Sequence, residues 1–398
     1  MEVLTCIKIF QNDLGILHHD RKNALTTCRA LKSTGLFTFS MVGGSLNHGQ
    51  PRVRKMTALE PGSDSWLDQV KEDIIDPERP IIDPHHHIWR KRFNTDYVLE
   101  QYWNDTNSGH NIVKTLFMEC RAFYDKDAEE HLQSVGETKY IADLAKQSKA
   151  DMQNQAYIAA IVAHTDLTRA GDSEELLLEA IEQHKLSSNG LLRGFRQSAA
   201  RDKRPEDLFI VGSAPPYLHG KESFRKGLRI IAEQGLSYDS WHYHHQNLDF
   251  LDLARDVPEC TMILDHFGTP LGVGIYRSCK DEIFQQWKED ITEIAKCENV
   301  YAKLGGLAMP DNGFGWHKAE RPPTSDEFVK QQQRYYMHTI ECFGPERCMF
   351  ESNFPVDKLS INYHVLWNAY KKMAQDFSEA EKQAMFYGTA EKVYSMRD

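Results

Sequence analysis

The chain has 398 residues, of which 41% are hydrophobic and 26% charged, so it can bury a large core in one or two domains. Its formal net charge of −11 at pH 7 argues against nucleic acid or an anionic membrane as a partner. The eight cysteines show no CxxC spacing and no apolar run approaches the ~20 residues that span a bilayer. We therefore expect a cytoplasmic protein with reduced thiols.

The first part of the chain differs in composition from the rest. Residues 1–55 carry eight Lys or Arg but only three acidic residues, with Ser and Thr interspersed. Such a stretch is typical of a disordered extension, and a mitochondrial transit peptide is the alternative. We expect an extension over residues 1–62, which ends in a linker at 51–62, and one folded domain over 63–398.

From residue 80 onward, short apolar runs alternate with longer amphipathic stretches. The runs lie at 80–83, 113–119, 156–163, 191–196, 236–242, 261–265, 299–304 and 347–352. Their composition suits buried strands, whereas 284–296 has a helical period and the last helix begins at a capping box, Ser378 with Glu381. Eight strand–helix repeats predict an α/β fold, a (β/α)8 TIM barrel. An open doubly wound sheet has less support, because no GxGxxG follows the first run.

Ionisable and amide residues gather at the ends of these predicted strands. They are Asp83, His85, His87, Glu119, Arg121, His164, Arg196, His242, His244, His266, Lys303, Asn353 and Asp357. In a barrel the carboxyl ends of the strands form one mouth, so these side chains should meet there. His85 and His87 are two apart on an extended segment and can converge on one ion, for which imidazole suits zinc, manganese or iron.

Five segments, in order, carry a family resemblance. They read RPIIDPHHHIW at 79–89, RGFRQ at 193–197, LDHFGTP at 264–270, KLGGL at 303–307 and CMFESNFPV at 348–356. Together they resemble the amidohydrolase-related family (amidohydrolase 2), and within it the TIM-barrel hydrolases that include lactonases for sugar lactones and pyrone dicarboxylate. The resemblance runs from about residue 66 to 394. It implies a (β/α)8 barrel, hydrolytic chemistry and one or no divalent metal.

The resemblance also implies roles for single residues. His85 and His87 match the HxH pair after the first strand, and His266 matches a histidine that polarises the substrate carbonyl or positions water. A histidine after the fifth strand binds metal in metal-containing relatives, and here we favour His244, with His242 next. The expected metal ligands are thus His85, His87 and His244, with zinc as the preferred ion or with none.

One position departs from the family pattern. Most relatives have Gly-Ser-Asp-Trp-Pro after the eighth strand, where Asp binds metal and acts as base, but residues 351–355 read ESNFP. Asn353 cannot accept a proton from water. Asp357 or Glu351 could take the base role, His266 or His244 could do so, or activity could be lost.

Other residues are candidates for binding the substrate. Arg196 and Arg121 suit a carboxylate or a lactone carbonyl, the alternative being ion pairs with neighbouring acids. Trp89 and Tyr243 are expected to wall the pocket, with His242 beside them. Lys303 is either a substrate contact or part of a rim salt bridge.

We therefore expect a hydrolase that acts on a lactone, ester or related C–O or C–N bond of a small carboxylate-bearing substrate. The catalytic residues would be His266, Asp357 and Asn353, with water activated by the histidines and a divalent metal. Non-oxidative decarboxylation of an aromatic acid is one alternative, and a non-catalytic binding barrel is another. The sequence leaves a homo-oligomer open.

Overall fold

A computed structural model describes residues 59–93, 95–151 and 155–397. Most of the predicted extension, residues 1–58, lies outside the described part, so its role and the boundary at residue 62 stay predictions. No helix in the described part is long and apolar enough to cross a membrane. The cytoplasmic location stays a prediction as well.

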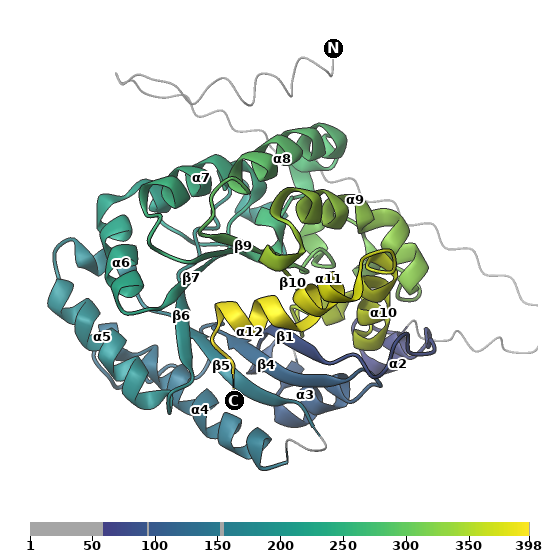
Figure 1. Ribbon diagram of the computed structural model, residues 1–398, viewed down its shortest axis with the longest axis horizontal. Helices are drawn as coiled ribbons and strands as arrows, with labels where there is room; N and C mark the ends of the chain where they lie inside the picture. Colours follow the sequence, from purple (N-terminus) through teal and green to yellow (C-terminus); the bar gives the residue numbers. More distant parts are fainter. Residues whose placement is uncertain (1–58, 94, 152–154, 398) are drawn as a thin grey trace, which may run out of the picture. The chain divides into compact units, whose positions relative to one another are not determined.

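Eight parallel strands form one sheet that curves into a nearly closed barrel (Figure 1), as the sequence predicts. All eight predicted strands are present. They are β1 (Ile81–His86), β4 (Ile112–Met118), β5 (Tyr157–Ala163), β6 (Leu192–Arg196), β7 (Ser237–Ser240), β8 (Met262–Leu264), β9 (Val300–Leu304) and β10 (Cys348–Phe350). They pair in sequence order from β1 to β10.

The segment that follows β10 closes the barrel against β1. The Asn353 N–H donates to the His85 carbonyl at 3.0 Å, and the His87 N–H donates to the Phe354 carbonyl at 2.8 Å. These two bonds continue the ladder beyond the end of β10, so the first and last motifs of the sequence lie side by side at the mouth.

Continuous apolar strands are buried on both faces because helices cover the sheet from outside. The covering helices are α4 (Val135–Ala150), α5 (Glu174–Ser187), α6 (Glu222–Glu233), α7 (Asn247–Asp256), α8 (Lys280–Ile294), α9 (Ser325–Phe343) and α10 (Tyr363–Met373), with α2 (Asp64–Leu67) and α3 (Leu99–Thr106) near the start. The predicted helix at 284–296 corresponds to α8. The predicted capping box is confirmed: Ser378 and Glu381 each accept the other's backbone N–H at the start of α11 (Glu379–Gln383).

The C-terminal segment packs across the end of the barrel opposite the cavity mouth. After α11 and a π-helical turn, α12 (Thr389–Val393) crosses this end (Figure 1), and Ala390, Tyr394 and Met396 pack in one cluster with inward residues of the strands. These side chains fill that end of the lumen, and a ligand can enter at the other end, where the strands have their carboxyl ends.

Two segments that the sequence did not predict wall the upper mouth. A hairpin of β2 (Trp89–Arg92) and β3 (Thr95–Tyr97) follows β1, and a long loop joins β6 to α6. Phe93 of the hairpin stacks on Phe209 of the loop at 5.2 Å between ring centroids. Asp311 fixes this loop by accepting the Phe209 and Ile210 N–H groups.

Candidate active site

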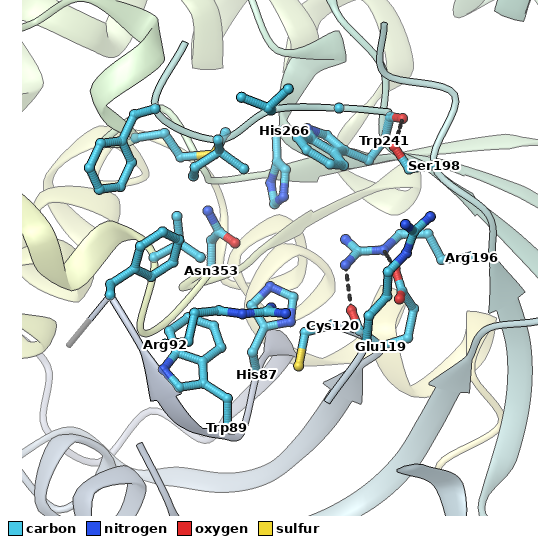
Figure 2. A pocket seen from close by; sticks show the side chains of 18 of the residues that line it. His87, Trp89, Arg92, Glu119, Cys120, Arg196, Ser198, Trp241, His266 and Asn353 are labelled. Carbon is cyan, nitrogen blue, oxygen red and sulfur yellow. Dashed lines mark hydrogen bonds and ion pairs between the residues drawn. The ribbon is translucent and has the colours of Figure 1, made fainter. Parts of the chain in front are cut away.

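A cavity of about 380 Å³ opens at the carboxyl ends of the strands (Figure 2). Six of the predicted site residues line it: His87, Trp89, Arg121, Arg196, His266 and Asn353. The remaining wall is largely apolar and aromatic, from Phe93, Phe209, Ile210, Val211, Trp241, Met309 and Val356. The barrel thus brings together residues that are far apart in the sequence, as a TIM-barrel mouth should.

Three imidazole rings converge at the floor of this cavity. The His85 ring lies 5.0 Å from the His87 ring and 4.5 Å from the His266 ring, measured between centroids. His85 is fully buried below the other two. The predicted meeting of histidines from separate strands therefore holds for these three.

His87 is oriented by a bond to the backbone. Its Nδ1–H donates to the Met118 carbonyl at 2.9 Å, which leaves Nε2 as the unprotonated nitrogen of a neutral ring. Burial, followed by the charge of Arg196, lowers the pKa of His87 well below 6.5. Burial, followed by Lys303, does the same for His85. Both rings are therefore neutral at physiological pH.

His266 is held differently, by a buried carboxylate. Its Nδ1–H donates to Glu351 Oε1 at 2.6 Å. In the neutral ring the other nitrogen, Nε2, is therefore unprotonated. Burial alone would lower the pKa of His266, but Glu351 and Asp265 outweigh it and raise the pKa above 6.5. This pair has the geometry of a general base with its orienting acid.

Two glycines make room for this pair. A Cβ on Gly306, whose φ is +77°, would lie 2.2 Å from His266 Nδ1, and a Cβ on Gly305 would lie 2.4 Å from Glu351 Cγ. The segment at 303–307 thus needs both glycines because the His266–Glu351 pair packs directly on its backbone. Glu351 stands where the family's usual motif has glycine, and this difference is the sequence feature that indicates a role for Glu351 in the site.

Arg196 lies among acidic groups rather than free in the mouth. Its Nε donates to Glu119 Oε1 at 2.8 Å, Nη2 donates to the Glu119 carbonyl at 2.6 Å, and Nη1 lies 3.3 Å from Asp265 Oδ2. The ion-pair alternative therefore describes its contacts, although the side chain still lines the cavity. Asp265 was not among the predicted site residues, and only its position next to His266 could have indicated it.

Arg121 and Arg92 differ from Arg196 in this respect. Both line the cavity, and within the described part of the chain neither makes an ion pair or a side-chain hydrogen bond. Arg92 lies over the Trp89 ring, 5.4 Å from its centroid. Arg92 was not among the predicted site residues, because the sequence pattern does not indicate a hairpin that turns back over the mouth.

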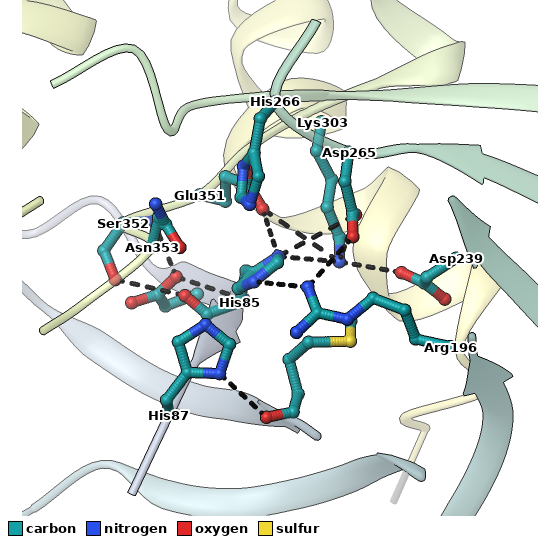
Figure 3. A network of polar contacts seen from close by, with 12 residues as sticks. His85, His87, Arg196, Asp239, Asp265, His266, Lys303, Glu351, Ser352 and Asn353 are labelled. Atoms are coloured by element: carbon teal, nitrogen blue, oxygen red, sulfur yellow. Dashed lines mark hydrogen bonds and ion pairs between the residues drawn. The ribbon is translucent and has the colours of Figure 1, made fainter. Parts of the chain in front are cut away.

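Lys303 is neither exposed at the rim nor a lining residue. It is fully buried in the lumen, where its Nζ lies 2.8 Å from Asp239 Oδ1 and 3.3 Å from Asp265 Oδ1 (Figure 3). Burial opposes its charge, but Asp239, Asp265 and Glu351 together raise its pKa. The predicted rim salt bridge is in fact an ion pair inside the barrel.

A metal ion can be tested against these residues. One ligand atom each from His85, Asp265 and His266 lie within 4.8 Å of one another, and this spacing is compatible with a metal site. The charge is not, because Lys303 Nζ lies 3.3 Å from both His85 Nδ1 and Asp265 Oδ1, which belong to two of the three candidate ligands. The residues therefore do not fit a divalent ion while Lys303 keeps this place, and zinc stays a prediction.

Two predicted histidines point away from the cavity. His242 bonds Ser240 Oγ through Nδ1 at 2.9 Å and Asn247 Oδ1 through Nε2 at 3.2 Å. His244 Nδ1 accepts the Leu271 N–H at 3.2 Å. Among the described residues, His244 is not part of the cluster around His85. The cause is local: β7 ends at Ser240, so the alternation of an extended strand does not continue to these positions.

Two further predicted residues support the site from behind. The Tyr243 hydroxyl accepts the Gly212 N–H and donates to the Ile210 carbonyl, so it braces the β6–α6 loop without lining the cavity. Asp357 is fully buried and accepts the Asn353 Nδ2–H at 2.9 Å. Asp357 thus orients Asn353 and is not itself placed to take a proton from water in the cavity.

Comparison with known proteins identifies the family of this chain. The amidohydrolase family model matches residues 82–396. The chain belongs to the amidohydrolase family. This amidohydrolase is 29% identical to the uncharacterized protein y4mH of Sinorhizobium fredii over 79% of the chain and 98% of that protein. It is 26% identical to the L-fucono-1,5-lactonase of Burkholderia multivorans over 79% of the chain and 96% of that protein.

A solved structure confirms the fold of this amidohydrolase. The crystal structure of an amidohydrolase from Burkholderia multivorans with bound zinc matches with a TM-score of 0.60 at 22% identity, over 80% of this chain and all of that one. The family and the relatives support an enzyme with a hydrolase-type reaction.

Proposed function

We propose that this protein hydrolyses a lactone or a related ester of a small substrate that carries an anionic group. The observation that carries the proposal is the Glu351–His266 pair at the floor of a cavity whose rim has two cations, Arg92 and Arg121, without acidic partners among the described residues. The curated lactonase among the relatives supports the reaction class.

The proposed attack begins with a water molecule held between two imidazole acceptors. His87 Nε2 and His266 Nε2 are both unprotonated in the neutral rings and can each accept a hydrogen from that water. The Oδ1 of Asn353, whose Nδ2 is bound to Asp357, is an alternative to His87 as acceptor of the second hydrogen. An amide can hold the water although it cannot take its proton.

His266 is the base in this proposal. As the water oxygen bonds to the carbonyl carbon, its proton passes to His266 Nε2, and Glu351 stabilises the imidazolium that forms. Arg196 supplies positive charge for the oxygen that becomes negative in the tetrahedral intermediate. His266 then returns the proton to the leaving alkoxide, and the ring opens to a hydroxy acid.

Arg121 and Arg92 favour a substrate with a carboxylate. An unpaired guanidinium binds a carboxylate through two parallel hydrogen bonds, whereas Arg196 is already committed to Glu119 and Asp265. The aromatic walls, from Trp89, Phe93 and others, suit the flat face of a ring.

The proposal is tested on a panel of lactones and esters with and without a carboxylate, including L-fucono-1,5-lactone. Ring opening is followed by acid release with a pH indicator, and CO2 release is measured on aromatic acids in parallel. We expect ring opening, faster with carboxylated lactones, and its loss in His266→Gln. The control is His338→Gln on the outer helix α9, which should keep full activity.

Release of CO2 without ring opening would instead favour the decarboxylase. No turnover with either set of compounds would favour the binding barrel.

A further inference from the structure

Lys303 lies beside two of the three residues that could hold a metal ion. Its Nζ is 3.3 Å from His85 Nδ1 and 3.3 Å from Asp265 Oδ1, and these residues supply two of the three candidate ligands. Asp239 Oδ1 at 2.8 Å and Glu351 Oε2 at 4.0 Å complete the acidic surroundings. The Tyr394 ring faces the ammonium at 5.4 Å, and the Tyr394 hydroxyl donates to Asp239 Oδ1.

A divalent ion and this ammonium compete for the same space. His85 Nδ1 and Asp265 Oδ1 are 3.8 Å apart. An ion bound to both at ~2.1 Å would lie at most ~3.6 Å from Lys303 Nζ, even on the opposite side of the line that joins them. The buried setting strengthens the repulsion between the two charges.

Binding the ion through the other nitrogen of His85 would not avoid this repulsion. His85 Nε2 lies 3.4 Å from Arg196 Nη1, so an ion on this side would meet the second buried cation. Each nitrogen of the central histidine thus lies within 3.4 Å of a permanent positive charge of the protein, although Nδ1 lies closer to Glu351 Oε2, at 2.8 Å. Neither cation is exposed at the surface, because both side chains are at least nine-tenths buried.

We propose that Lys303 is the resident cation of this site and holds the place of a divalent metal in this chain. Its ammonium lies within 3.3 Å of Asp239, Asp265 and His85, and it supplies the positive charge that sets these side chains in position. The inference concerns the charge inside the barrel and does not rest on which bond the enzyme cleaves.

The first test is the metal content of the wild-type protein. The full chain is produced in medium supplemented with zinc and purified without chelators, and metals are measured by mass spectrometry. We expect less than about 0.1 zinc per chain, and no saturable binding of added Zn²⁺ by calorimetry at micromolar concentration. About one tightly bound zinc per wild-type chain would overturn the proposal, whatever the activity.

The second test removes the ammonium. Lys303→Met keeps an unbranched side chain that is one atom shorter and leaves Asp239, Asp265 and Glu351 without their cation. This variant should bind one Zn²⁺ at least about 100-fold more tightly than the wild type, and Zn²⁺ should raise its Tm. Lys303→Arg keeps the charge and should gain no binding, and neither should Lys114→Met, which removes a buried lysine of β4.

These outcomes separate the inference from the proposed function. A Lys303→Met protein that folds and binds Zn²⁺ no better than the wild type would overturn the inference even if lactones are hydrolysed. If this variant does not fold, the metal content of the wild type decides alone.

Discussion

The substitution Glu351→Gln tests the pairing of His266 most sharply. It removes one negative charge from a fully buried position and nearly conserves the volume of the side chain. The amide oxygen can still accept the Nδ1–H of His266, so the ring can stay in place. What disappears is the charge that stabilises the imidazolium during proton transfer.

The expected magnitude follows from the distance between the two groups. Unit charges 2.6 Å apart, the separation of His266 Nδ1 and Glu351 Oε1, attract by about 6 kcal/mol at an effective dielectric constant of 20. The amide dipole retains part of this stabilisation. We therefore expect kcat to fall by ~10²–10⁴-fold, the usual range for general acid–base catalysis. KM should change by less than about threefold, because Glu351 is not among the residues that line the cavity.

The assay is steady-state kinetics on the best lactone of the panel, with folding checked by circular dichroism and Tm. The matched control is Glu137→Gln, another buried acidic side chain, which accepts the Cys120 and Ala122 N–H groups and does not itself line the cavity. This control should lose stability but keep kcat within about threefold. A kcat for Glu351→Gln within tenfold of the wild-type value would refute the role assigned to the pair.

Three further predictions follow from the same site. Arg121→Ala and Arg92→Ala should each raise KM for a carboxylated lactone by ~10–100-fold and leave KM for a neutral lactone nearly unchanged, as measured by parallel kinetics; equal effects on both would contradict the assigned role. Because the pKa of His266 is raised and the base must be neutral, kcat/KM should increase with pH through a midpoint above 6.5, and a pH–rate profile with a midpoint below 6.5 would argue against this base. Burial raises the pKa of Asp357 from 3.8 to about 7, so its protonation stabilises the fold at low pH and this contribution, ~4 kcal/mol, is lost as the pH rises through 7. Asp357→Asn cannot accept both the Asn353 and the Ala308 N–H and should lower Tm, but by less at pH 8 than at pH 5; an equal or larger loss at pH 8 would contradict this account.

The sequence predicted those features that depend on periodicity and on strand ends. The eight buried runs predict the eight-stranded barrel that is observed. The positions of His85, His87 and His266 at strand ends predict that their rings meet at one mouth, and the three rings do lie together. His242 and His244 do not reach this mouth, because strand alternation does not continue beyond Ser240, where β7 ends.

Other features depend on contacts that no local pattern contains. The charge of Lys303 was visible in the sequence, but its position inside the lumen depends on carboxylates from β7 and from the segments after β8 and β10. Arg92 reaches the cavity only because the β2–β3 hairpin folds over the mouth. Asn353 stands where the family motif has an Asp that acts as base, whereas this chain has a carboxylate two residues earlier, at Glu351.

The most direct test of the account is a comparison of wild type and His266→Gln on one carboxylated lactone, with ring opening followed by acid release. We predict saturable hydrolysis by the wild type and a loss of at least ~10²-fold in kcat in the variant, with the fold intact. Equal rates of ring opening in the two proteins would contradict the assignment of His266 as the base.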